Sequence, residues 1–268
     1  MTAVVIVPVF NAPEATARCL EALERTTASD TEVVVIDDAS TDPRMSAVFE
    51  RLPASWRLLE NARNLGFVAT ANRGMQAAGQ RDVVLLNSDA VPAGDWLERI
   101  RACAATDPAI ASITPFSNNG EIASIPEFCR ANPVPEDPEL WARACRDAGP
   151  PVYPELPTAV GFCMYLRRRC LDRIGPFDAE AFGAGYGEEN DWCLRATSSG
   201  WKHVLCDDAF VAHQGNASFG PLGLKPDQDS MRRLLRRHPD YLETIQAFIE
   251  ADPVRPARER VLRTLHAG

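Results

Sequence analysis

Apolar runs and helical patterns alternate through the first third of the chain. Four apolar runs are strand candidates, at residues 4–9, 32–37, 56–61 and 82–87. A capping box of Asn11 and Glu14 predicts a helix from there to about Arg25, and a second helix is predicted over residues 66–78, ended by Gly79. This order predicts an α/β fold of right-handed βαβ units: a Rossmann-like, mostly parallel central sheet flanked by helices, with ligands at the carboxyl ends of the strands.

The pattern changes after residue 116. A turn-rich segment and a proline-rich one predict an insertion or lid-like excursion over residues 117–157, around a short helical piece. Regular structure resumes at residues 158–167, followed by a short helix to residue 174, a helix over about 189–199 and a strand that ends near His213. The tail from Pro226 has a polar helical pattern. We therefore expect one α/β domain over residues 1–220, divided near residue 115, and a helical C-terminal extension over residues 221–268.

Composition narrows the class of protein. The 268 residues are 46% hydrophobic and 24% charged, which is typical of an ordinary globular chain with one large domain or two small ones. No apolar stretch approaches the roughly 20 residues that span a bilayer, and the first apolar run lacks a basic leader and a cleavage pattern, so we expect no transmembrane segment and a cytoplasmic protein. The formal charge of -9 argues against nucleic-acid binding, although a metal could bridge an acidic pocket to an anionic ligand.

The cysteines and histidines do not form a metal-binding motif. Eight cysteines are scattered without a C-x-x-C pair, and there are four histidines. A zinc cluster needs closely spaced Cys and His ligands. The sequence therefore predicts reduced, mostly buried thiols.

Two of the strand candidates end in polar and acidic residues. Asn87, Ser88 and Asp89 follow one apolar run, and Asp37 and Asp38 follow another. Either segment could be an ordinary polar turn or a helix cap. If the two strands are neighbours, their acids point into one crevice, where a carboxylate can hold a metal-bound phosphate. The pattern thus indicates a nucleotide site, and in particular a nucleotide-sugar site.

A cationic loop runs into the second predicted helix. Arg63, Asn64 and Gly66 precede the helix, whose first free N–H groups favour contacts with phosphate or a polar base. The segment has neither a P-loop nor a G-x-G-x-x-G pattern, which argues against an NTPase or a dehydrogenase. Asn72, further along, either faces a nucleotide or packs inside the helix.

Three acids fall in the first turn of the helix near residue 189. Glu188, Glu189 and Asp191 could merely complement the helix dipole. Beside a glycine-rich loop, however, crowded acids raise one another's pKa values, which suits a general base. Helical spacing places Glu188 and Asp191 on a common face and Glu189 on a different one. A lone histidine such as His213 is more often structural, but beside Asp89 it would form a donor set that suits Mn²⁺-like ions.

Taken in order, these segments resemble glycosyltransferase family 2 over about residues 3–220. The resemblance rests on six motifs in sequence order: residues 7–11, 36–40, 63–66, 87–89 and 188–192, and His213. It implies a GT-A fold, a nucleoside-diphosphate-sugar donor, a divalent cation (Mn²⁺ or Mg²⁺) and inversion at the anomeric carbon. It also implies that residues 1–115 are the nucleotide-binding half and residues 116–220 the acceptor half.

The resemblance assigns roles to individual residues. Asp89 and His213 would be metal ligands, and Glu189 the general base. The acceptor would be bound by Glu188, Asp191 and Trp192. The expected nucleotide-binding residues are Pro8, Phe10, Asn11, Asp38, Arg63, Asn64, Gly66, Asn72, Asn87 and Ser88.

The chain departs from the family pattern at two positions. Asn87 replaces the first Asp of the D-x-D motif, which lowers the negative charge at the metal. Glu189 replaces the usual Asp, a longer arm with the same chemistry. The segments at residues 64–67 and 114–119 look most like bacterial members that build surface polysaccharides or glycoconjugates, among them rhamnosyl- and hexosyltransferases. The acceptor would then be a hydroxyl of a glycan, a lipid-linked or a protein-linked molecule.

Two other functions stay open. A sugar-1-phosphate nucleotidyltransferase would share the sheet but normally carries a Gly-rich basic loop near its N-terminus, which residues 7–11 lack. A sugar-nucleotide-binding module that has lost turnover would keep the same fold. Peripheral membrane contact is a further possibility, because four arginines cluster between residues 232 and 237. Acids interleave with them, so a solvated helix face is the favoured interpretation.

Overall fold

The computed structural model describes residues 3–183, 185–215 and 228–267, and nine strands of this part form one sheet. The strand order is β3-β2-β1-β4-β8-β6-β9-β5, and β7 pairs with β9 outside that path. The strands are β1 (Val4–Val9), β2 (Val33–Asp37), β3 (Arg57–Glu60), β4 (Val83–Leu86), β5 (Ala90–Pro92), β6 (Ile110–Phe116), β7 (Glu155–Leu156), β8 (Cys163–Leu166) and β9 (Lys202–His213).

The pairing confirms the predicted mostly parallel sheet. Strands β1, β2, β3, β4, β6 and β9 run in one direction, while β5, β7 and β8 run in the other. β1 lies between β2 and β4, with Val5 opposite Val33 and Val84. The carboxyl ends of these three strands therefore meet at one edge, as expected for a Rossmann-like half.

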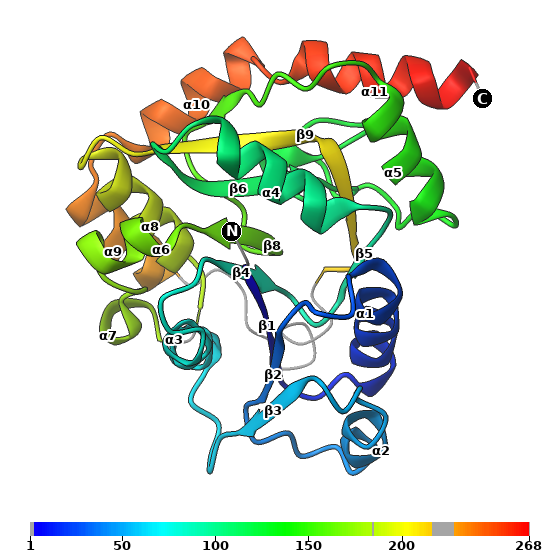
Figure 1. The fold of residues 1–268 in the computed structure, drawn as a ribbon. Helices are drawn as coiled ribbons and strands as arrows, with labels where there is room; N and C mark the ends of the chain where they lie inside the picture. Colours follow the sequence, from blue (N-terminus) through cyan, green and yellow to red (C-terminus); the bar gives the residue numbers. More distant parts are fainter. Residues whose placement is uncertain (1–2, 184, 216–227, 268) are drawn as a thin grey trace.

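Helices cover both faces of the sheet, as Figure 1 shows for α1 and α3 on opposite sides of the first strands. Cys19 and Leu23 of α1 pack into one core cluster, and Val68 and Met75 of α3 pack into the cluster on the other face. The helices are α1 (Pro13–Thr26), α2 (Met45–Phe49), α3 (Phe67–Ala77), α4 (Trp96–Thr106), α5 (Pro138–Asp147), α6 (Arg168–Ile174), α7 (Ala179–Phe182), α8 (Glu188–Thr197), α9 (Gln228–Arg237), α10 (Tyr241–Ala251) and α11 (Arg255–Ala267), with a 3-10 turn, η1, at Glu121–Ala123.

The predicted capping box is wrong. Helix α1 begins at Pro13 with Ala12 as its N-cap, and no side chain caps it. The side-chain oxygen of Asn11 instead accepts hydrogen bonds from the backbone N–H groups of Thr41 (2.8 Å) and Asp42 (2.9 Å). The Asn11 side chain, which the local pattern predicts to cap the helix, thus forms long-range hydrogen bonds instead.

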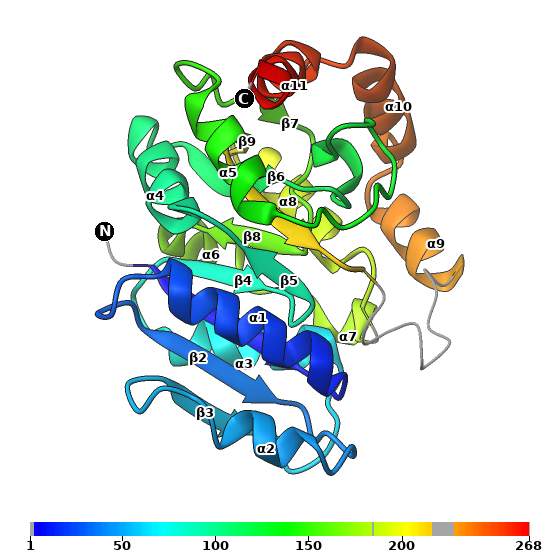
Figure 2. The same cartoon turned by 90° about the vertical axis from the view of Figure 1, so that its right-hand side faces the viewer.

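The proline-rich segment packs against the core through its helix. Its helix α5 buries Ala142 and Cys145 in a cluster with Phe210 of β9 and Val261 of α11. Figure 2 shows α10 and α11 at the end of the molecule opposite β3, and the tail is helical, as predicted. No helix of the described residues is long and apolar enough to cross a membrane. All eight cysteines are free thiols, and seven of them are buried, as predicted.

Candidate active site

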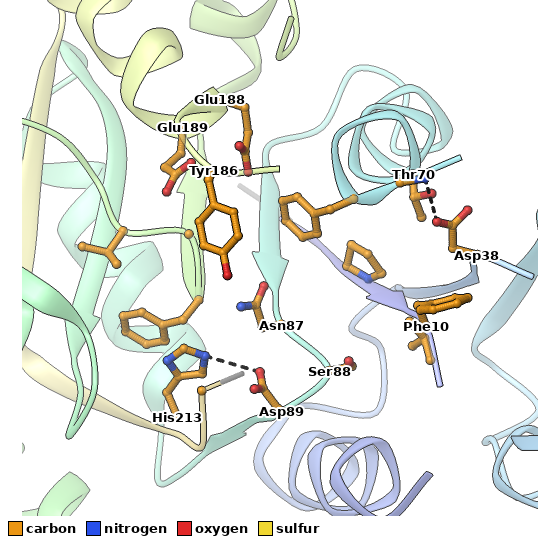
Figure 3. Close-up of a pocket in the computed structure, with 18 of the residues that line it drawn as sticks. Phe10, Asp38, Thr70, Asn87, Ser88, Asp89, Tyr186, Glu188, Glu189 and His213 are labelled. Atoms are coloured by element: carbon orange, nitrogen blue, oxygen red, sulfur yellow. Dashed lines mark hydrogen bonds and ion pairs between the residues drawn. The ribbon is translucent and has the colours of Figure 1, made fainter. Parts of the chain in front are cut away.

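A cavity of about 430 Å³ opens where the ends of β1, β2 and β4 face helix α8 (Figure 3). Its walls come from the strand ends of the first half of the chain and from the loops before α8 and after β9. It gathers eleven of the residues selected from the sequence: Pro8, Phe10, Asp38, Asn64, Gly66, Asn87, Ser88, Asp89, Glu188, Glu189 and His213.

Asp38 ties the end of β2 to the start of α3. Its backbone N–H donates to the carbonyl of Val9, at the end of β1 (2.8 Å). Its carboxylate accepts hydrogen bonds from the backbone N–H groups of Leu65 (2.8 Å) and Gly66 (2.9 Å) and from the Asn61 amide (2.7 Å). Gly66 has a φ of 83°, and a Cβ there would lie 2.5 Å from the Gly183 carbonyl oxygen, so glycine is required. The buried Asp38 is thereby fixed at the cavity wall.

Five residues selected from the sequence lie outside this cavity. Arg63 is exposed and does not line the cavity. The side chain of Asn11 accepts a hydrogen bond from the loop after β2. The Asn72 side chain pairs with the backbone of Phe177, donating to its carbonyl (2.8 Å) and accepting from its N–H (3.1 Å). Trp192 is fully buried and donates from Nε1 to the Gly175 carbonyl (3.0 Å), while Asp191 pairs with side chains at the end of α9. These contacts satisfy the side chains of Asn11, Asn72, Asp191 and Trp192 within the protein.

Strand pairing brings Asp89 and His213 together across the cavity floor. In the antiparallel β5–β9 ladder Ala90 lies opposite His213, and the N–H of Gln214 donates to the Asp89 carbonyl (3.1 Å). This register places Nε2 of His213 3.3 Å from Oδ1 of Asp89, the contact drawn in Figure 3. A pair separated by more than a hundred residues in sequence is therefore set by backbone hydrogen bonds.

Two asparagines orient His213. Asn118 accepts a hydrogen bond from the His213 backbone N–H (2.8 Å) and donates to its carbonyl (3.0 Å). The ring nitrogen Nδ1 lies 2.7 Å from the Asn119 carbonyl oxygen, an acceptor, so Nδ1 carries the proton and Nε2 turns toward Asp89. The Phe162 ring stacks on the imidazole at a centroid distance of 5.2 Å. Burial disfavours the charged ring, but the hydrogen bond and charge of Asp89 outweigh it and raise the pKa of His213.

The Asp89–His213 pair fits a divalent cation by its donor chemistry. A carboxylate and an imidazole whose other nitrogen donates to a carbonyl form a donor set for Mn²⁺-like ions. No cluster of three or more His, Cys, Asp and Glu side chains within the described ranges could hold an ion alone. The protein would supply two ligands, and the remainder would come from a ligand's oxygens or from water. Such an incomplete sphere suits a metal that is bound together with a phosphate.

Glu188 and Glu189 form a second acidic group on the opposite wall, above Tyr186 in Figure 3. Within the described part of the chain, the buried Oε2 atom of each has no hydrogen-bond partner. Burial raises the pKa of both carboxyls, and the charge of Glu189 raises that of Glu188 further, while a hydrogen bond between the two groups couples them. Burial thus favours the protonated form of these two carboxyls, as expected for groups that exchange protons in catalysis.

The predicted sharing of helix faces is wrong. Both glutamates line the cavity, whereas Asp191 is turned away from it. Its fully buried carboxylate receives Arg195 (2.8 Å), Arg237 (3.3 Å) and His238 (3.0 Å). Glu188 and Glu189 are the first two residues of α8, where side chains leave the helix toward the preceding loop, so interior helical spacing does not apply to them.

Several cavity residues escape the motif analysis. Glu121, Tyr186 and Phe162 line the cavity, and Asn118 lies just behind His213. The turn-rich segment after β6 and the glycines around Tyr186 are the signals that could have indicated two of them. Phe162 precedes β8 in an apolar stretch, and nothing in the sequence distinguishes it from a core residue.

The mostly parallel sheet and the cavity at its strand ends define a Rossmann-like α/β protein. The family model described as Glycosyl transferase family 2 matches residues 4–175, well over half of the chain. The chain therefore belongs to glycosyl transferase family 2.

Two curated relatives match a shorter part. An "Uncharacterized glycosyltransferase" of Haemophilus influenzae is 28% identical over 98 residues, or 36% of this chain and 30% of that protein. A "Putative glycosyltransferase EpsH" of Bacillus subtilis is 26% identical over 95 residues, or 35% of this chain and 26% of that protein. The matches thus span less than a third of either relative.

Two solved structures share the fold. GalNAc-T7 with UDP, GalNAc and Mn²⁺ superposes with a TM-score of 0.66 and 15% identity, over 98% of this chain and 54% of that one. The mannosyltransferase PcManGT from Pyrobaculum calidifontis, with GDP-Man and Mn²⁺, gives a TM-score of 0.59 and 18% identity, over 99% and 74%. At these identities the likeness establishes the GT-A fold.

Proposed function

We propose that this protein is an inverting glycosyltransferase that moves a sugar from a nucleoside-diphosphate sugar to a hydroxyl of a glycan or glycoconjugate acceptor. The observation that carries the proposal is a single cavity with a carboxylate–imidazole pair on one wall and two partly unpaired glutamates on the other. The first pair suits a metal-bound diphosphate, and the second suits removal of a proton from an attacking hydroxyl. Their positions leave the space between them for the sugar.

The strand ends of the first half would bind the nucleotide. Pro8, Phe10 and Asp38 line the side of the cavity at the ends of β1 and β2, and Asn64 and Gly66 add the start of α3. Asp89 and His213 would hold a divalent cation, which would offset the charge that develops on the departing nucleoside diphosphate. Two structures with the same fold contain a nucleotide together with Mn²⁺. Hexosyl or rhamnosyl transfer to a bacterial surface polysaccharide is the form of the reaction that the motifs favour.

Glu189 would be the general base. Its carboxyl lies in the cavity, and burial, followed by the charge of Glu121, raises its pKa, which favours proton uptake. It would take the proton from the acceptor hydroxyl as that oxygen attacks the anomeric carbon from the face opposite the diphosphate. The bond to the diphosphate breaks as the new glycosidic bond forms, and this single displacement inverts the configuration.

The proposal is tested by turnover. UDP-, GDP- and dTDP-sugars are incubated with the protein in Mn²⁺ and in EDTA, and release of the nucleoside diphosphate is measured. We expect metal-dependent release from one nucleotide series, lost in Asp89→Ala and kept in Glu180→Gln, which changes an exposed acid of α7. Release that is equal in EDTA would contradict the metal assignment. Binding without release would favour a module that has lost turnover.

A further inference from the structure

Glu121 lines the same cavity and belongs to neither of the two acid groups already described. It is the first residue of the short turn η1, directly after the segment that orients His213. The charge of Glu121 raises the pKa of both His213 and Glu189. Its carboxylate therefore lies within electrostatic range of both walls of the site.

The backbone holds Glu121 in a left-handed conformation, with a φ of 48°. Such a conformation is unfavourable for a residue with a Cβ and persists only where the surroundings impose it. Here the loop is closed by hydrogen bonds from Ser117 N–H to the Ala123 carbonyl (3.1 Å), from Ile125 N–H to the Ser117 carbonyl (2.8 Å) and from Gly120 N–H to Ser124 Oγ (3.0 Å). The loop thus fixes the Glu121 side chain at the cavity.

The Glu121 carboxylate has no hydrogen bond or ion pair to any residue that the structure describes. Glu127, on the neighbouring loop, pairs by contrast with Arg130 (3.3 Å). A rigid, strained backbone that presents an unpaired carboxylate to a cavity indicates recognition of a ligand rather than stabilisation of the fold. Because the residue is solvent-accessible, a ligand can reach it.

Acidic side chains predominate among the charged residues around the cavity. Its acidic lining residues are Asp38, Asp89, Glu121, Glu188 and Glu189, and no lysine or arginine lines it within the described ranges. A sugar hydroxyl can donate a hydrogen bond to a free carboxylate. A sugar carboxylate beside Glu121 would instead face like charges with no arginine or lysine among the described lining residues, which is unfavourable in a partly desolvated site.

We propose that Glu121 binds a hydroxyl of the transferred sugar and makes the site selective for uncharged over uronate sugars. The inference rests on the proposed function, because the transferred sugar must lie between the diphosphate at Asp89 and His213 and the base at Glu189. Glu121 faces that space from the loop that also orients His213. It is a specificity-determining residue and takes no part in proton transfer.

The test compares matched neutral and anionic donors by calorimetric titration in Mn²⁺. The probes are UDP, UDP-glucose and UDP-glucuronate, and GDP, GDP-mannose and GDP-mannuronate. In the series that binds, we expect the wild-type protein to prefer the neutral sugar nucleotide by about tenfold or more. Glu121→Gln should weaken binding of the neutral form several-fold, reduce the preference and leave the affinity for the free nucleoside diphosphate unchanged.

Glu127→Gln is the matched control, because it removes the same charge from an exposed loop outside the cavity, and it should behave as wild type. Equal wild-type affinity for neutral and uronate forms would overturn the inference, even if Glu121→Gln failed to fold. An unchanged preference for the neutral sugar nucleotide in Glu121→Gln would also overturn the inference. It would indicate that Glu121 contacts the acceptor instead. If neither UDP nor GDP nor their sugars bound, the proposed function itself would fail, a result distinct from nucleotide binding without sugar discrimination.

Discussion

The acidic side chains on the two sides of helix α8 have opposite environments. On the side away from the cavity, Asp191 is fully buried and receives three basic side chains, two of them from the C-terminal extension. On the cavity side, two and three residues earlier, Glu189 and Glu188 each have one buried oxygen left unpaired within the described structure. Burial raises the pKa of every one of these acids, but only Asp191 has partners that reverse the shift and lower it.

This difference separates acids that stabilise the fold from acids that can take part in proton transfer. A buried carboxylate surrounded by cations stabilises the fold and stays ionised. A buried carboxyl without such partners costs stability and can exchange a proton at moderate pH, which is the property a base needs. Motif position alone does not make this distinction, because the three acids lie within four consecutive residues.

The largest expected effect is on turnover. Replacing Glu189 by Gln keeps the shape of the side chain but removes its capacity to accept a proton. Turnover should fall by about 10²–10⁴-fold, the range for loss of a general base, with donor affinity nearly unchanged. Stopped assays of nucleoside-diphosphate release, with Glu180→Gln as control, measure this. Near-normal turnover would show that another group is the base.

Replacing the acid on the other side of the helix, Asp191, by its amide should lower stability rather than turnover. Asp191→Asn leaves Arg195, Arg237 and His238 without their buried charge and should cost about 3 kcal/mol of unfolding free energy in urea at neutral pH. Because the folded-state pKa of Asp191 is lowered, its stabilisation is present above the unfolded pKa and is lost as the pH falls, so the difference from wild type should shrink below about pH 4. Asp229→Asn, at an exposed ion pair, is the control, and an equal loss there would refute the contrast.

Glu188→Gln should increase the stability of the folded protein, in contrast to Asp191→Asn. The folded-state pKa of Glu188 is raised, mainly by burial and then by Glu189, so ionisation at neutral pH opposes folding. The variant should unfold at a temperature a few degrees higher than wild type near pH 7.5, and the gain should vanish as the pH falls below the unfolded pKa, near pH 4. A lower melting temperature at pH 7.5 would contradict this account.

The smallest effect is expected from His238→Ala. Asp191 would keep its two arginines and lose one hydrogen bond, so unfolding free energy should fall by about 1 kcal/mol. His266→Ala, at an exposed position of α11, should leave stability unchanged. Comparing the two by urea unfolding shows whether the extension stabilises α8 through this contact. A loss as large as that of Asp191→Asn would mean that His238 carries the whole interaction.

The sequence was sufficient to predict the parallel half of the sheet and the acids at its strand ends. Apolar runs such as that of β1 and the polar turns that follow them are local signals, and parallel pairing brings those turns together without further information. Glu189 was equally visible, since its motif is contiguous.

Contacts between distant segments could not be predicted in this way. The His213–Asp89 distance depends on the β5–β9 register, and the ring orientation depends on Asn118 and Asn119 from another loop. The resemblance assigns Asp191 to the acceptor, and nothing local in the sequence shows that Arg237 and His238 return to cover it. Glu121 carries no motif, and only its left-handed backbone and its place in the cavity distinguish it.

The central claim is that this cavity takes a metal-bound nucleoside diphosphate. Calorimetric titration of the wild-type protein with UDP, GDP and dTDP, each with and without Mn²⁺, tests it most directly. The account predicts that at least one of the three binds in Mn²⁺ and that its affinity falls by tenfold or more without the metal. Binding of none of them, or equal affinity with and without Mn²⁺, would contradict it.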